Sequence, residues 1–430
     1  MKRRAFGCLF LFFAAGLFVR SEGPQKLSLD NGMTVVFQQD KASAVTVLEI
    51  QIRGGQAAEG AAQAGLSFLA TRLGIDIPDN TTARDFMVKA LHYTLAARSD
   101  YSVIQLECLT VFFEDILDSF VKILSDPLFT GIRIDRIREY MDHQRRIQAD
   151  DAGNVGHLAQ LTAFFGDAGY GNSVYGTEKS LKGLKTKDIK DFYERYFVAG
   201  NMTLTAVSDL DKDRMMSILG RNFGKFQKSA AAPAIPSAAM SSSLPISGET
   251  QRIDKDVLQS FVSSAYPLPP VSRRGFALTS IVENTLGRGP GTRLWALRTE
   301  AKLAYNVAAL ATQMKDGGFI EAFLETDPGK EKEAGAALER ILDDFREHGV
   351  TAEELEIAKI GLKAQFLRAN ETKAGRASTL CTFEALGLGA DFFTAFAREV
   401  DEIAPDEINN HIRVVFDPAR AHRVVVGPKR

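Results

Sequence analysis

The sequence predicts an α+β protein with two similar domains, each built on an antiparallel-rich mixed sheet with helices packed mainly on one face. Three observations support this prediction. The 430 residues are 45% hydrophobic and 25% charged, which is typical of a folded chain long enough for two or three domains. Short β-prone runs and longer helical stretches follow each other in the same order in both halves. Residues 228–250, rich in Ala, Pro and Ser, predict a linker between the halves.

Residues 1–21 predict a signal peptide. Three basic residues precede the apolar run 5–19, which is shorter than the roughly 20 residues that a membrane span needs. We therefore expect cleavage after Ser21, export to the periplasm and no stable membrane anchor. Cys8 lies within the apolar run, too early to become a lipidated first residue.

Charge and cysteine content exclude several classes of protein. Lys plus Arg number 52 and Asp plus Glu 54, and no basic block interrupts this balance. Nucleic acid is therefore excluded as a partner. The three cysteines, Cys8, Cys108 and Cys381, are too few for a disulfide framework or a thiolate metal site.

The first predicted domain, residues 22–227, opens with a hairpin and a longer strand. Residues 27–39 predict the hairpin because Asn31-Gly32 is a dipeptide that tolerates the positive φ angles of a type I′ turn. Apolar and polar residues alternate over 45–53, which predicts a half-buried strand with one apolar face. Gly54-Gly55 ends this strand.

Helices and a further strand follow in the first domain. Apolar residues at helical spacing predict one helix over 116–124 and another over 134–141. Thr186 is the predicted N-cap of a third helix, which ends near Tyr196. Residues 202–207 predict a strand.

The second predicted domain, residues 251–430, repeats this order. Residues 260–265 and 319–326 predict strands, with a helix and a Gly-rich turn between them. Long helices follow, and one of them opens with Thr351 and Glu354 at the spacing of a capping box.

No metal site within the chain is predicted from the histidines. The closest two of the six are eleven residues apart, so no helix presents a His pair as zinc motifs do. His143 and His157 could meet only through the fold, and we interpret each as a partly exposed polar residue.

The turn 287–291 follows a helical run instead of a strand, so we interpret it as a helix-terminating turn and not as a phosphate loop. The charged segment 292–307 predicts an amphipathic helix followed by a strand. Leu294, Trp295 and Leu297 should face inward, with the charges solvated.

Five stretches resemble one known family over nearly the whole chain after the signal peptide. They read LDNGMTVVFQQD, RGGQAAEGAAQAGLSFLATRL, ARSDYSVIQLECL, YGNSVYGTEKSLKGLKTKDIKDFYERYFVAGNMTLTAVSDLD and LGRGPGTRLWALRTEAKLAYNV. Together they resemble the insulinase-like (pitrilysin) zinc metallopeptidases. That family includes the mitochondrial processing peptidase and the core proteins of the respiratory cytochrome complex.

The sequence departs from that family at the zinc motif. The resemblance implies His-x-x-Glu-His on the first helix, but the three positions here are Phe68, Thr71 and Arg72. A Phe ring has no lone pair to give, and Arg is a permanent cation that repels Zn²⁺. The later Glu ligand of the family falls near His143 or Gln144. The resemblance therefore implies that this chain holds no cofactor and hydrolyses no peptide by itself.

A second family element survives. The resemblance implies an Arg and a Tyr, seven residues apart, that donate hydrogen bonds to the substrate carbonyl, and Arg298 and Tyr305 occupy those positions. In some bacterial relatives one chain carries the zinc motif and another carries this pair, and our sequence resembles the second kind.

The resemblance implies a non-catalytic, substrate-positioning subunit of an exported peptidase. It would form a heterodimer with a related zinc-bearing chain and bind an extended peptide by strand addition. The alternative is a purely structural or binding paralogue with no role in proteolysis. The role of Arg298 and Tyr305 separates the two.

Overall fold

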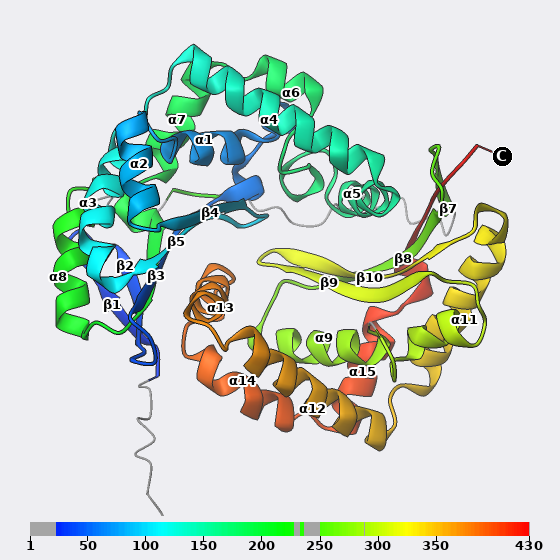
Figure 1. Cartoon of the computed structure of the whole chain (residues 1–430). Helices are drawn as coiled ribbons and strands as arrows, with labels where there is room; N and C mark the ends of the chain where they lie inside the picture. Colours follow the sequence, from blue (N-terminus) through cyan, green and yellow to red (C-terminus); the bar gives the residue numbers. More distant parts are fainter. Residues whose placement is uncertain (1–22, 228–232, 236–249, 288, 430) are drawn as a thin grey trace, which may run out of the picture.

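The computed structural model describes residues 23–227, 233–235, 250–287 and 289–429. It confirms the α+β class, with two sheets of mixed strand orientation (Figure 1). The predicted signal peptide and most of the predicted linker 228–250 lie outside the described residues, so the domain boundaries stay predictions. Among the described residues, no helix is both long and apolar enough to cross a membrane.

The sheet of the first half has six strands. Only β2 and β6 run parallel, and the other neighbours are antiparallel. Across the sheet the strands are β1 (Gln25–Ser28), β2 (Thr34–Gln39), β6 (Met202–Ser208), β3 (Val45–Arg53), β5 (Tyr101–Leu109) and β4 (His92–Ala97). Strand β4 therefore ends the sheet.

The sheet of the second half has the same topology without a counterpart of β1. Its strands are β7 (Thr250–Asp254), β11 (His422–Gly427), β8 (Ser260–Leu268), β10 (Gly317–Thr326) and β9 (Asn306–Met314). Here β7 and β11 are the parallel pair. The predicted strands 260–265 and 319–326 lie within β8 and β10, so the predicted similarity of the two halves is confirmed.

Most helices cover one face of each sheet and bury its apolar side chains in a core of its own. In the first half they are α1 (Leu66–Gly74), α2 (Asn80–Val88), α3 (Thr110–Ser125), α4 (Gly131–Asp150), α5 (Ala152–Phe165), α6 (Glu178–Gly183), α7 (Thr186–Tyr196) and α8 (Lys212–Phe223). In the second half they are α9 (Arg273–Leu286), α10 (Ala296–Thr299), α11 (Glu331–His348), α12 (Ala352–Ala369), α13 (Lys373–Ala385), α14 (Phe392–Asp401) and α15 (Pro405–Val415).

The second face of each sheet packs against a helix of the other half. Helix α13 contacts β3 and β6, while α5 contacts β8 and β11 (Figure 1). The prediction that β3 is half-buried is therefore wrong, because Glu49 and Gln51 on its polar face are 3% and 1% exposed. The amide of Gln105 donates to Glu49 at 2.7 Å, which is how a carboxyl group is accommodated there.

The predicted hairpin is present, but its turn is not the predicted type I′ turn. Register pairs Ser28 with Thr34, so residues 29–33 form the connection. Gly32 has a φ of 85°, whereas Asn31 is not among the residues with positive φ. Instead, the Asn31 side chain donates to the carbonyl oxygen of Phe223 at 2.9 Å, which ties the hairpin to the end of α8.

Two predicted helix starts have different outcomes. Helix α7 begins at Thr186, so the N-cap is Lys185 and the predicted cap is one residue off. The capping box at α12 is confirmed. The Thr351 hydroxyl accepts from the N–H of Glu354 at 3.1 Å, and the Glu354 carboxylate accepts from the N–H of Thr351 at 2.8 Å.

The charged segment after the Gly-rich turn is less helical than predicted. It forms a 3₁₀ turn over Arg293–Trp295 and the single-turn helix α10, and β9 follows. Leu294 and Leu297 are buried as predicted, while Trp295 is only half-buried. The helical run before the turn ends at Leu286, and Gly287, with a φ of 32°, is its C-cap.

Candidate functional site

Helix α1 carries the three positions that the resemblance assigns to a zinc motif, and a buried carboxyl group holds its start. Glu59 accepts hydrogen bonds from the backbone N–H groups of Gly65, at 2.9 Å, and Ser67, at 2.7 Å. These N–H groups have no partner within the helix, so Glu59 acts as its cap. Burial raises the pKa of Glu59 to about 7, because the two hydrogen bonds offset only part of the desolvation.

Glu59 should make the stability of the fold depend on pH. Its pKa is raised from 4.5 to about 7, so its contribution is complete below about pH 4.5 and is lost as pH rises to about 7. At about 1.4 kcal/mol per pKa unit, the loss in free energy of unfolding is about 3 kcal/mol. Urea unfolding at several pH values measures it. Glu59→Gln should flatten the profile and Glu139→Gln, at an exposed site on α4, should not. Equal profiles for all three proteins would contradict the prediction.

The first zinc-motif position is filled by an aromatic cluster. Phe68 is 6% exposed. Its ring stacks on Tyr140 of α4, with centroids 6.1 Å apart, and meets Tyr175 edge-on at 5.1 Å. The cluster surrounds one side of a cavity of about 510 Å³ between α1, α4 and β4.

The other two positions do not fit zinc either. Thr71 is buried, and its hydroxyl donates to the carbonyl oxygen of Ser67 at 2.7 Å. Arg72 lines the cavity with its cationic side chain. A ring, an engaged hydroxyl and a guanidinium supply no set of ligands for Zn²⁺.

Tyr140 is the residue of α4 that meets Phe68. His143 is exposed on α4, and neither His143 nor Gln144 lines the cavity. The expectation that one of these two stands at the position of the lost Glu ligand therefore gains no support from the geometry. In the ranges that the structure describes, no three His, Cys, Asp or Glu side chains gather as a metal site would require.

The purified chain is expected to bind no stoichiometric zinc, because none of the three α1 positions offers a ligand. Metal analysis after dialysis checks this. About one equivalent of zinc, lost when one histidine of the chain is replaced, would contradict it.

Arg298 and Tyr305 are both exposed, on a different part of the chain. The Arg298 guanidinium lies 4.8 Å from the centre of the Trp295 ring, a cation–π contact that orients it. The phenol of Tyr305, a residue 52% exposed, donates to Asp327 at 2.8 Å. This hydrogen bond raises the pKa of Tyr305, so the phenol remains a donor. Neither residue lines the cavity at Phe68.

The Arg298 guanidinium can donate hydrogen bonds to an oxygen that gains negative charge, whereas the Tyr305 phenol, whose single O–H is given to Asp327, can do so only after it releases that carboxylate. The backbone N–H of Tyr305 donates to the carbonyl of Glu325 at 2.9 Å, which fixes the residue at the start of β9. The Asp327 carboxylate beside Tyr305 is already engaged by that phenol and by Lys330, so we assign the two donors no role in activating water. They would need a reacting centre supplied from elsewhere.

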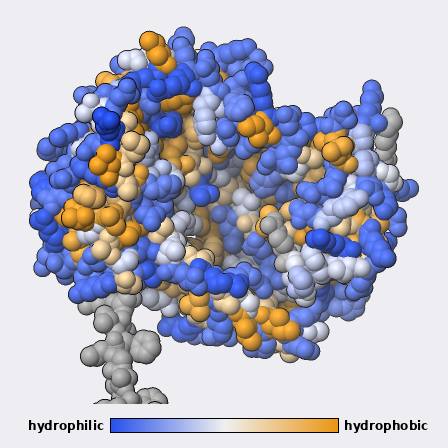
Figure 2. Space-filling view, viewed as in Figure 1, coloured by the Kyte–Doolittle hydropathy of each residue, from blue (hydrophilic) through white to orange (hydrophobic). Residues whose placement is uncertain are grey.

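A larger cavity of about 770 Å³ lies between the two halves, where Figure 2 shows the molecule hollowed. His157, which lines it, contacts Glu321 of β10 with Nδ1 and Oε2 2.9 Å apart. Glu321 is 3% exposed, and its second carboxylate oxygen has no hydrogen-bond partner among the described residues. The pair therefore fastens α5 to the second sheet, and no sequence signal links two residues so far apart in the chain.

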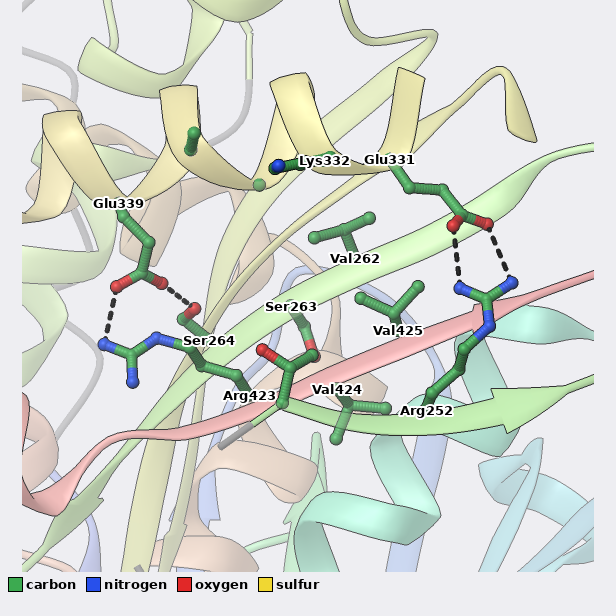
Figure 3. Close-up of a pocket in the computed structure, with 13 residues that line it drawn as sticks. Arg252, Val262, Ser263, Ser264, Glu331, Lys332, Glu339, Arg423, Val424 and Val425 are labelled. Atoms are coloured by element: carbon green, nitrogen blue, oxygen red, sulfur yellow. Dashed lines mark hydrogen bonds and ion pairs between the residues drawn. The ribbon is translucent and has the colours of Figure 1, made fainter. Parts of the chain in front are cut away.

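A groove of about 420 Å³ separates α11 from β7, β8 and β11 (Figure 3). Its floor is apolar, with Val262 and Val425. Arg252 contacts Glu331 at 2.7 Å, and Arg423 contacts Glu339 at 2.7 Å, so the charges at its two ends are paired. We assign these pairs to the packing of α11.

The chain is similar to proteins of one known peptidase family. The model described as the peptidase M16 inactive domain matches residues 183–362. The chain is 22% identical to a protein named non-peptidase homolog YmxG, from Helicobacter pylori, over 387 residues that cover 88% of each chain. It is 22% identical to an uncharacterized zinc protease of Mycobacterium leprae, over 95% of this chain and 93% of that one.

Solved structures show the same fold at lower identity. A peptidase M16 inactive domain from Pseudomonas fluorescens matches with a TM-score of 0.84 and 20% identity, over 95% of this chain and 98% of that one. A chain of complex III from Candida albicans matches with a TM-score of 0.81 and 14% identity, over 94% and 96%.

Proposed function

Because residues 183–362 match the model of the peptidase M16 inactive domain, we propose that this chain positions an extended peptide for a related, zinc-bearing subunit. One observation carries this proposal. The ring of Phe68, packed against Tyr140 and Tyr175, takes the place that the resemblance assigns to a zinc ligand, which supports a role that depends on a partner for its chemistry.

The exposed donors support a contribution to that partner's site. Arg298 and Tyr305 are both exposed, and no metal-binding group of side chains is present among the described residues of their own chain. A partner that placed a zinc-bound carbonyl against them would receive a hydrogen bond from Arg298 and, once Tyr305 turned from Asp327, a second one from the phenol. We further propose that the heterodimer acts after export to the periplasm.

The open edge of β4 offers a way to bind the peptide. Strand β4 ends the first sheet, so its outer edge pairs with no other strand among the described residues. An extended peptide that adds to this edge would be held through its backbone, which suits a protein that accepts many sequences.

The second candidate is a structural or binding paralogue. It is favoured by one finding, the likeness in fold to a chain of complex III from Candida albicans. A paralogue of this kind would keep the fold, but its Arg298 and Tyr305 would donate no hydrogen bonds to a substrate.

Reconstitution separates the two functions. A zinc-bearing M16 chain from the same genome is purified, and hydrolysis of a quenched fluorescent peptide is measured for each chain alone and for the mixture. We expect turnover only in the mixture. If the partner alone matches the mixture, the positioning role fails and the structural role replaces it.

A further inference from the structure

We propose that the cavity at Phe68 is a pocket for a carboxylate on a peptide bound along β4, an inference that rests on the proposed peptide-binding role. The lost metal site would thus have become a site of recognition. Three features of the cavity lead to this: its walls, its charge and its place beside the sheet edge.

The walls are largely aromatic. A volume of about 510 Å³ is within the range of small-ligand pockets and holds a large side chain with its neighbours. The side chains that give it this character are Phe68, Tyr93, Leu95, Tyr140 and Tyr175. An apolar or aromatic side chain of a peptide would be stabilised by moving from water into this cavity.

The charge of the cavity is positive. Asp76 is 9% exposed and is held by two arginines, with Nη2 of Arg136 2.6 Å from both of its carboxylate oxygens and Arg133 bound as well. Arg72 adds a third guanidinium, and it has no ion-pair partner in the part of the chain that the structure describes. The residues that line the cavity therefore carry two guanidinium groups, those of Arg72 and Arg136, against one carboxylate, that of Asp76.

The excess of positive charge favours a carboxylate over an ammonium group as the ligand. Aromatic cages otherwise suit ammonium groups, which are attracted to ring faces. Here Arg72 and Arg136 would repel a cation, whereas a guanidinium binds a carboxylate through two parallel hydrogen bonds. The cavity therefore fits an anionic group next to an apolar one.

The sheet edge would deliver that group. Tyr93 and Leu95 of β4 line the cavity, so both side chains lie on the face of the sheet that α1 covers. Alternate side chains of a peptide added beside β4 would point to the same face. Two sources of carboxylate are compatible with this geometry, the free C-terminus of a peptide and an internal acidic side chain.

Binding of fluorescein-labelled peptides, measured by anisotropy with the purified chain, tests the proposal. One pair has the body Ala-Thr-Val-Ser-Thr-Ala-Val-Phe, as the free acid and as the amide. The other is amidated and carries Glu or Gln before the final Phe. We expect the charged member of at least one pair to bind about tenfold more tightly, since hydrogen bonds between charged groups are stronger than those between neutral groups. The responding pair identifies the source.

Matched variants assign the effect to the pocket. Arg72→Gln should abolish the preference for charge and Arg72→Lys should keep part of it. Arg84→Gln, which removes the same charge from an exposed site on α2, should leave it unchanged. The proposal is overturned if no peptide binds, if both pairs bind equally, or if the Arg72 and Arg84 variants behave alike. A preference that depends on Arg72, in a mixture no more active than its partner alone, would uphold the pocket and refute the positioning role.

Discussion

Replacing Arg298 by alanine is expected to lower the turnover of the reconstituted two-chain peptidase about 100-fold to 1000-fold, the usual cost of removing one donor to a developing oxyanion. Tyr305→Phe should have an effect of similar size, because it also removes one donor to the developing oxyanion. The rest of the side chain is unchanged. Both residues are exposed, so neither change opens a cavity in the core. Initial rates at saturating peptide measure the effect.

Two further variants separate the chemistry of this pair from a loss of assembly. Arg298→Lys should restore only part of the rate, because a point charge does not reproduce the planar fork of a guanidinium. Arg340→Ala removes an exposed arginine from α11 and should change nothing. Gel filtration should show the heterodimer in every case. Full activity of the Arg298 and Tyr305 variants would refute the shared site and leave the structural role.

Local patterns predicted the elements of the fold and missed the contacts between them. The alternation in β3 gave its bounds as Val45–Arg53, yet the polar face was expected in solvent. It is buried because α13, more than 300 residues away in the sequence, covers it; the Cys381 thiol lies 3.7 Å from the Gln51 side chain. Asn31 shows the same limit, since its turn is set by α8 and not by the dipeptide.

The same is true of the candidate site: the sequence identified some of its residues but not the contacts between them. Family resemblance located Phe68 and Arg72, and chemistry alone excluded them as zinc ligands. The stacking of Phe68 on Tyr140 depends on how α4 crosses α1, which no spacing within either helix reveals. The unbalanced charge around Asp76 likewise appears only when α4 is placed beside the end of α1.

The contact between the halves leads to the second large prediction. Helix α13 is fastened to the first half by Arg376, which binds the carboxylate of Asp40, and by Lys373, which donates to the carbonyl oxygens of Ser43 and Val45 at 2.7 and 2.8 Å. The side chains of Asp40 and Arg376 are 11% and 21% exposed, so water replaces a lost partner only in part.

Arg376→Met is therefore expected to lower the free energy of unfolding by about 3 kcal/mol, because it leaves the Asp40 carboxylate nearly buried without its guanidinium. Asp40→Asn combined with Arg376→Met should recover a large part of this loss, since the double variant has no unpaired charge. Urea unfolding of the two single variants and the double variant gives the coupling energy.

A second ion pair between the halves serves as the control. Lys255 lies 3.8 Å from Asp150, and the aspartate side chain is 87% exposed, so Lys255→Met should cost about 1 kcal/mol or less. If both variants cost the same, burial does not set the strength of these pairs. If Arg376→Met costs far more, burial sets what the Asp40–Arg376 pair contributes to the docking of α13, the helix that covers Glu49 and Gln51 on the sheet beneath it.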